Sequence, residues 1–201
     1  MRKGMLLLAL TLLLAALTGC TGAPKEMTLT PIQTELSGEN AAPSAVFSYE
    51  VGAPAKSVTG TLHIVRNGSW ESRSFGGVNL PAHKGRVGLV YDMLTGTMGM
   101  AVSQGDQLAN GVGGEWKPDD AEALKALNRG SITRADPFQI ELEKEVIVQV
   151  QAAADGDRMV LKVLDDLDTC KKELEQLDYP FAAVLTLTFS EEKIEGEEAG
   201  K

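Results

Sequence analysis

Apolar and polar residues alternate in short runs after residue 44, a period of two that is typical of β-strands with one buried face. The runs that predict strands lie at 45–51, 58–64, 86–92, 97–103, 138–152, 159–164 and 181–189. The most regular run, 138–152, has apolar residues on its even positions and Glu or Gln on most odd positions. Because it is longer than an ordinary strand of about 3–10 residues, we expect a bulge or break near Lys144.

Turn signals lie between these runs at Asn67-Gly68 and Asp155-Gly156, and loop signals lie at 76–77, 81–85 and 103–115. Asn-Gly predicts a type I′ hairpin turn, because both central residues of that turn take a positive φ. Two short helices are expected. One covers 119–130 with Asp119 as its N-cap, and the other covers 167–177 and ends before Pro180.

Short strands separated by turns, together with two short helices, predict a mainly β fold, either an antiparallel β-sandwich or an α+β sheet. We expect a single β-rich domain over residues 45–190. Residues 20–44 are rich in Thr, Pro, Gly, Ala and Ser without a regular period, so we interpret them as a flexible tether. Residues 191–201 are acidic and predicted to form a disordered tail.

The first twenty residues differ from the rest of the chain. Arg2 and Lys3 precede an apolar run at 5–17, which at thirteen residues is shorter than the about 20 needed to span a bilayer. Leu17-Thr18-Gly19-Cys20 then closes the run. This segment resembles the signal peptide and lipobox of bacterial lipoproteins.

That resemblance implies that residues 1–19 are removed after recognition of Leu17, Thr18 and Gly19. It also implies that Cys20 becomes the mature N-terminus and carries diacylglycerol and palmitate. Two or more acyl chains give a stable anchor, whereas one chain binds only marginally. We therefore expect a lipoprotein on the extracytoplasmic face of the cell membrane, or of the outer membrane in a Gram-negative cell.

Charge narrows the choice of partners. The whole chain has a formal charge of −9, and loss of Arg2 and Lys3 with the signal peptide changes it to −11. Such a domain is repelled by nucleic acid and anionic lipid, which leaves the membrane contact to the lipid on Cys20. We expect a monomer whose partner is an envelope protein or a glycan.

Candidate chemistry is sparse. His63 and His83 are twenty residues apart and neither has a further ligand at a metal-binding spacing, so we expect no metal and no cofactor. Cys170 is interpreted as a small buried apolar residue. Glu141, Glu143 and Glu145 alternate along one predicted strand and are interpreted as a solvated face rather than a calcium site. Trp70 and Trp116 are weak candidates for binding a sugar or a partner.

The sequence therefore favours an envelope binding or scaffold module without a catalytic site. The alternative is an exported hydrolase whose site is assembled from scattered acids such as Asp92, Asp106 and Asp136. A cleft with two close carboxylates of shifted pKa would favour the enzyme, and a flat apolar or aromatic patch would favour the module.

Overall fold

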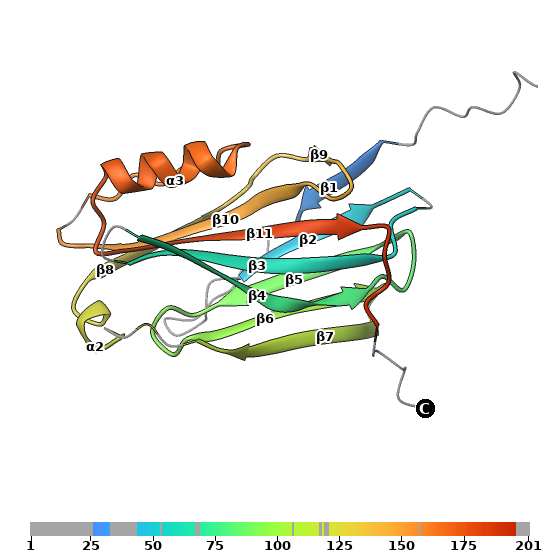
Figure 1. The fold of residues 1–201 in the computed structure, drawn as a ribbon, viewed down its shortest axis with the longest axis horizontal. Coiled ribbons are helices and arrows are strands. Elements are labelled where there is room, and N and C mark those ends of the chain that lie inside the picture. Colours follow the sequence, from blue (N-terminus) through green and yellow to red (C-terminus); the bar gives the residue numbers. More distant parts are fainter. Residues whose placement is uncertain are drawn as a thin grey trace, which may run out of the picture.

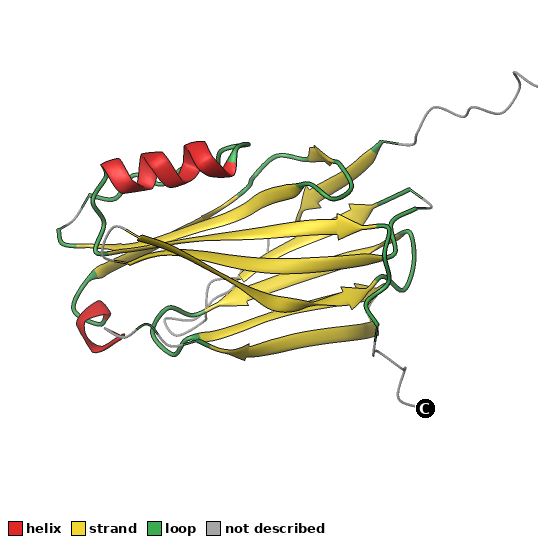
Figure 2. Ribbon diagram, in the orientation of Figure 1, coloured by secondary structure: helices red, strands yellow, loops and turns green. Residues whose placement is uncertain are grey.

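The computed structural model describes residues 26–32, 44–52, 54–66, 69–105, 107–116, 118, 121–156 and 158–195. Two antiparallel sheets pack face to face in these ranges, and two short helices accompany them (Figures 1 and 2). This confirms the predicted mainly β fold and selects the β-sandwich. The signal peptide, Cys20, the Asn67-Gly68 turn, Asp106 and Asp119 lie outside the described residues.

The first sheet, sheet A, has the strand order β7-β6-β5-β2-β1-β9. Its strands are β1 Met27–Pro31, β2 Ser44–Glu50, β5 Lys84–Tyr91, β6 Thr97–Gln104, β7 Gln107–Glu115 and β9 Phe138–Ile140. The second sheet, sheet B, has the order β4-β3-β11-β10-β8. Its strands are β3 Ser57–Arg66, β4 Ser69–Asn79, β8 Asn128–Thr133, β10 Glu145–Ala154 and β11 Phe181–Ser190.

The main core lies between the two sheets and follows from the alternation of the strands. In β2, Phe47 and Tyr49 point inward and are at most 2% exposed. The ring of Phe47 meets the edge of Phe138 with centroids 6.2 Å apart, and the ring of Tyr49 lies 6.1 Å from that of Phe189. Strands from both sheets thus contribute to one apolar cluster.

Helix α3 (Leu167–Gln176) covers part of the outer face of sheet B, as Figure 1 shows. Its N-cap is Asp166, whose side chain accepts the backbone N–H of Thr169 at 2.8 Å. Cys170 and Leu174 are buried in a second apolar cluster with β10 and β11. The helix predicted at 167–177 is therefore confirmed, and it explains why β10 and β11 are buried on both faces.

The predicted tether is wrong at residues 27–31, which form β1. Thr28 pairs with Glu50 of β2 on one side and with Gln139 of β9 on the other. Leu29 is completely buried. The apolar alternation here is only five residues long, too short to identify a strand before its two neighbours are known. Residues 33–43 of the predicted tether lie outside the described residues.

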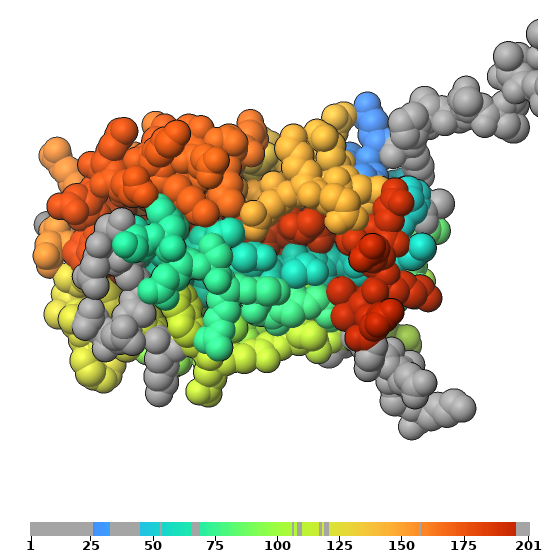
Figure 3. All heavy atoms as spheres, viewed as in Figure 1, coloured from blue at the N-terminus to red at the C-terminus, as the bar shows by residue number. Residues whose placement is uncertain are grey.

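The predicted disordered tail is also wrong over its first residues. Ser57 donates its hydroxyl to the backbone oxygen of Glu192 at 2.6 Å. The Asn79 side chain accepts the Ile194 N–H at 2.9 Å and donates to its carbonyl at 3.2 Å. These bonds hold 191–195 against the ends of β3 and β4, where they appear in red in Figure 3. Residues 196–201 lie outside the described part of the chain.

Two predicted loops are strands. Residues 107–115 form β7, because β6 supplies a hydrogen-bonding partner along the whole Gly-rich segment. Residues 76–77 continue β4 past a bulge, at which Phe75 is inserted opposite Gly60 and Gly76 takes a φ of +103°. Glycine lacks a strong preference for strands, so pairing with the neighbouring strand determines the extended conformation of these segments.

The predicted helix at 119–130 is limited to α2 (Ala121–Leu124), and the chain then enters β8. Gly130, expected to end that helix, lies in β8 opposite Ala152. The strand predicted at 159–164 is absent, because β8 and β11 already occupy both edges of β10. Asp155-Gly156 therefore does not join a hairpin. Residues 158–166 instead pack beneath α3, where the Tyr179 hydroxyl accepts the Val160 N–H at 2.9 Å.

The break predicted near Lys144 is confirmed, and it moves the chain from sheet A to sheet B. Residues 141–144 connect β9 to β10, and Glu143 takes a φ of +59°. A second irregularity between Ile147 and Gln149 shifts the register of β10. Gln149 and Gln151, predicted on the solvated face, are consequently 1% and 0% exposed. The Gln151 amide donates to the Tyr91 carbonyl at 3.1 Å, which offsets part of the cost of burial.

Candidate functional site

The outer face of sheet A is an apolar surface made by four strands. Phe47 in β2, Leu89 in β5 and Met100 in β6 point into the core. Their neighbours in sequence therefore point outward, and these outward residues are partly exposed. They border a shallow hollow of about 480 Å³ lined by Val46, Gly88, Leu89, Val90, Gly99, Met100, Ala101, Gly111, Val112 and Gly113.

The floor of this hollow is flat because four of its residues are glycines. A Cβ at Gly88 would meet only the Val46 side chain, at 3.7 Å, so the space above β5 is open. Val90 and Ala101 give the floor its apolar character. Charged residues lie at one end of the strands, where Lys84 contacts Glu50 at 3.0 Å. The arrangement suits a flat apolar surface of a partner, held by burial rather than by directed polar contacts.

A second group of interest, the His63 cluster, lies on the outer face of sheet B beside α3. We define it as His63 of β3, Ser72 of β4, Glu145 of β10 and Thr186 of β11. The Nδ1 atom of His63 lies 2.8 Å from the Ser72 hydroxyl, and its Nε2 atom lies 2.8 Å from Glu145 Oε1. His63 is 5% exposed, whereas Ser72 is exposed to solvent.

Electrostatics keep the Glu145 carboxyl ionised. Burial by itself would raise its pKa, but hydrogen bonds from His63 and Thr186 and the charges of His63 and Lys171 lower it below the usual value. An ionised Glu145 can accept a hydrogen bond from the Nε2–H of His63. In the tautomer that carries its proton on Nε2, the Nδ1 atom can accept a hydrogen bond from the Ser72 hydroxyl. Ser72, His63 and Glu145 thus stand in the order of a nucleophile, a base and an orienting acid.

From the sequence, we interpreted His63 as an ordinary surface histidine, and nothing connected it with Ser72 or Glu145. The three residues are brought together because β4, β3, β11 and β10 are neighbours in sheet B. No local spacing signals such a cluster. The polar character of His63 on the apolar strand β3 was the only available hint.

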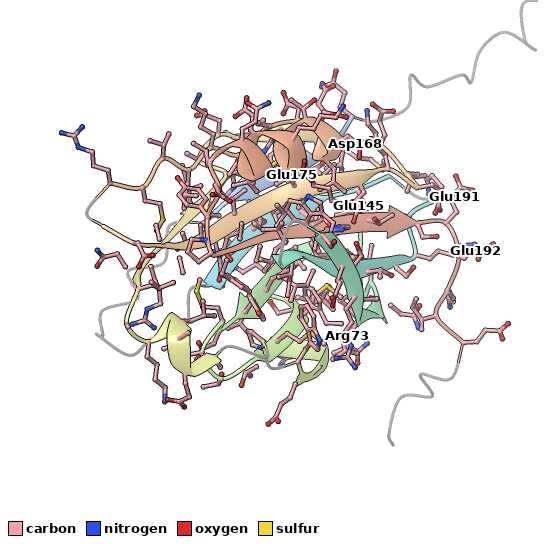
Figure 4. The ribbon with its side chains drawn as sticks, turned by 60° about the vertical axis from the view of Figure 1, so that its left-hand side comes forward. Arg73, Glu145, Asp168, Glu175, Glu191 and Glu192 are labelled. Atoms are coloured by element: carbon pink, nitrogen blue, oxygen red, sulfur yellow. The ribbon has the colours of Figure 1, made fainter. Side chains whose placement is uncertain are left out.

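The two tryptophans proposed for binding are partly buried. The Trp70 indole donates to Glu175 Oε1 of α3 at 2.7 Å, and the Lys171 ammonium lies 5.4 Å from its ring centre (Figure 4 labels Glu175). Trp116 packs against the main core, and its backbone N–H bonds to the Gly96 carbonyl at 2.7 Å. Both side chains therefore contribute to packing in this structure.

Cys170 is 1% exposed, and burial raises the pKa of its thiol to about 11, as expected for a structural cysteine. Among the described residues, no group of three His, Cys, Asp or Glu side chains is placed to hold a metal ion.

The predicted acidic residues do not form one site. Glu141 pairs with Lys144 at 3.1 Å, Glu143 accepts the Glu191 N–H at 3.0 Å, and Glu145 belongs to the His63 cluster (labelled in Figure 4). Of the hydrolase candidates, Asp92 accepts the Leu94 N–H at 2.8 Å and fixes the turn between β5 and β6. Asp136 is exposed, and Asp106 lies outside the described residues.

Comparisons with family models, with curated proteins and with solved structures find no match for this chain. Within the ranges that the structure describes, no helix is both long enough and apolar enough to cross a membrane.

Proposed function

We propose that this protein is a lipid-anchored extracytoplasmic module that binds another envelope protein through the outer face of sheet A. The anchor rests on the lipobox-like segment that ends at Cys20. Since Glu26 already precedes β1, six residue steps separate it from Cys20. Fully extended, they span about 20–22 Å. The sandwich would therefore stay close to the membrane instead of swinging on a long tether.

The observation that carries the binding role is the difference between the outer faces of the two sheets. Part of the outer face of sheet B is covered by α3, whereas the glycine-floored face of sheet A remains partly exposed. A protein partner fits this face better than a glycan does. Its hollow is lined by Gly, Ala, Val, Leu and Met, without the aromatic rings or polar side chains that sugars use.

The anchor is tested by mass spectrometry of the N-terminus in the membrane fraction. We expect acylated Cys20 in the wild type, and an unprocessed chain without lipid for Cys20→Ser, because serine has no thiol to form the thioether. An N-terminus at any other residue would reject the anchor.

The binding face is tested by comparing membrane pull-downs of the wild type, Gly88→Lys and Gln176→Lys. Lysine at position 88 would place a charge in the apolar hollow, and its Cβ has room there. Gln176 is exposed on α3, so its variant adds the same charge on the opposite side of the sandwich. We expect a protein partner that is lost only with Gly88→Lys. Equal recovery with all three chains would exclude the face, and recovery of a glycan would reject the protein partner.

The His63 cluster favours a second candidate function, hydrolysis of an ester. Ser72 Oγ would attack the carbonyl carbon while its proton moves to His63 Nδ1. That proton would then pass to the leaving alcohol, and water would release the acyl group from Ser72. A fluorophosphonate probe should label the wild type but not Ser72→Ala, with Ser74→Ala as the control on the same strand. Absence of labelling in the wild type would rule out this candidate.

A further inference from the structure

Strand β7 is an edge of sheet A, and among the described residues no strand pairs with its outer side. Edge strands are normally kept apart by short length, charged side chains or proline. The edge strand β9 has three residues, β4 carries Glu71 and Arg73, and β8 carries Arg129. In contrast, the nine-residue β7 has no proline and its only charged residue is the terminal Glu115. It has one bulge, at Ala109, which leaves residues 111–115 regular.

The backbone of β7 is oriented to accept another strand. The Trp116 N–H points toward β6, where it bonds to the Gly96 carbonyl. Peptide groups alternate in direction along an antiparallel strand, so those of Gly111, Gly113 and Glu115 point to the open side. All three residues are exposed. On the inner face, β4 approaches so closely that a Cβ at Gly76 would lie 3.3 Å from Val112.

We propose that β7 pairs with β7 of a second copy of this chain, antiparallel about a two-fold axis at Gly113. This register uses the regular half of β7 and avoids the bulge at Ala109 in the same strand. It places Gly111 opposite Glu115 of the other copy, and Gly113 opposite itself. No like charges face each other, and the two six-stranded sheets join into one.

This dimer differs from the monomer expected from the sequence. It does not depend on the proposed lipid anchor or on a protein that binds the outer face of sheet A. If the anchor is also present, the pairing has a geometric consequence. The two copies of β1 run in opposite directions, so both Cys20 lipids reach one bilayer only when the strands lie along its surface.

Position 111 provides a test that depends on the sign of one charge. A Cβ there meets its nearest neighbour, the Met100 carbonyl, at 3.5 Å, so a side chain fits. In the proposed register, Gly111→Glu puts a carboxylate opposite Glu115 of the other copy, at two symmetric places. Gly111→Lys puts an ammonium there instead. We expect Gly111→Glu to weaken the dimer by roughly 2- to 30-fold and Gly111→Lys to leave it equal or tighter.

The measurement is sedimentation velocity of the full chain in detergent over a series of concentrations. Glu115→Lys combined with Gly111→Glu should restore the dimer, and Gln176→Glu and Gln176→Lys control for net charge. Gly88→Lys should dimerise like the wild type, which separates this edge from the binding face. A wild type that stays monomeric overturns the proposal. Equal effects of Gly111→Glu and Gly111→Lys also overturn it, because the contact would then lie elsewhere.

Discussion

Leu29→Ala should destabilise the domain, even though Leu29 lies in a segment whose composition is that of a linker. Its side chain is completely buried, and among the described strands β1 alone joins β9 to the rest of sheet A. Truncation of a buried leucine costs about 2–5 kcal/mol of unfolding free energy. For a domain of this size, each kcal/mol lowers Tm by about 2–4 °C. We therefore expect Tm to fall by about 4–20 °C.

Thr30→Ala is the matched control, because Thr30 is the exposed neighbour of Leu29 in the same strand. Surface substitutions of this kind change stability by about 0.5 kcal/mol or less. Circular dichroism melts of the three chains decide the question. If Leu29→Ala and Thr30→Ala melt together with the wild type, residues 27–31 act as a tether and the role assigned to β1 is refuted. A chain that starts at residue 45 lacks β1 altogether, so we expect it to melt below Leu29→Ala.

Three further predictions concern single side chains. Gly60→Ala should lower the free energy of unfolding by about 1–3 kcal/mol, because its Cβ would lie 2.7 Å from the Phe75 ring. A lower midpoint of urea unfolding with an unchanged m-value would show this loss. Glu145→Gln should be less stable than the wild type at neutral pH. The lowered pKa of Glu145 means that this gap closes as the pH falls below the usual carboxyl value of 4.5, and a gap that widens in acid would contradict the His63 contact. Cys170 should resist alkylation at pH 8 until urea unfolds the chain, since its pKa is raised to about 11.

Alternation of apolar residues predicted most of the strands, because one face of each had to enter the core. It worked for 45–51, 58–64 and 181–189, where the pattern is regular and each strand is paired on both sides. It failed for β7, whose glycines carry no apolar signal, and for β1, whose pattern is only five residues long. Both strands are stabilised by hydrogen bonds to neighbouring strands, which the residue pattern of the strand itself does not reveal.

The candidate sites depend on tertiary structure more than the strands do. The outward positions of sheet A, such as Val90 and Ala101, follow from the strand pattern, but only the fold shows which outer face α3 covers. The His63 cluster unites residues from strands separated by up to 123 positions, as in the contact of His63 with Thr186. The bulge in β10 also reverses which of its positions face the core between the sheets, because Val148 lies in that core whereas Val150 and Ala152 lie in the cluster beneath α3. A strict period of two cannot anticipate such a reversal.

Site-specific photo-crosslinking in intact cells tests the binding role most directly. A photoreactive residue at Val90 would lie in the hollow of sheet A, and one at Gln176 would lie on α3 as the control. In the chain that retains Cys20, we predict that Val90 crosslinks to a second protein and Gln176 does not. No crosslink at Val90, or the same crosslinks at both positions, would contradict the assignment of this face as the binding surface.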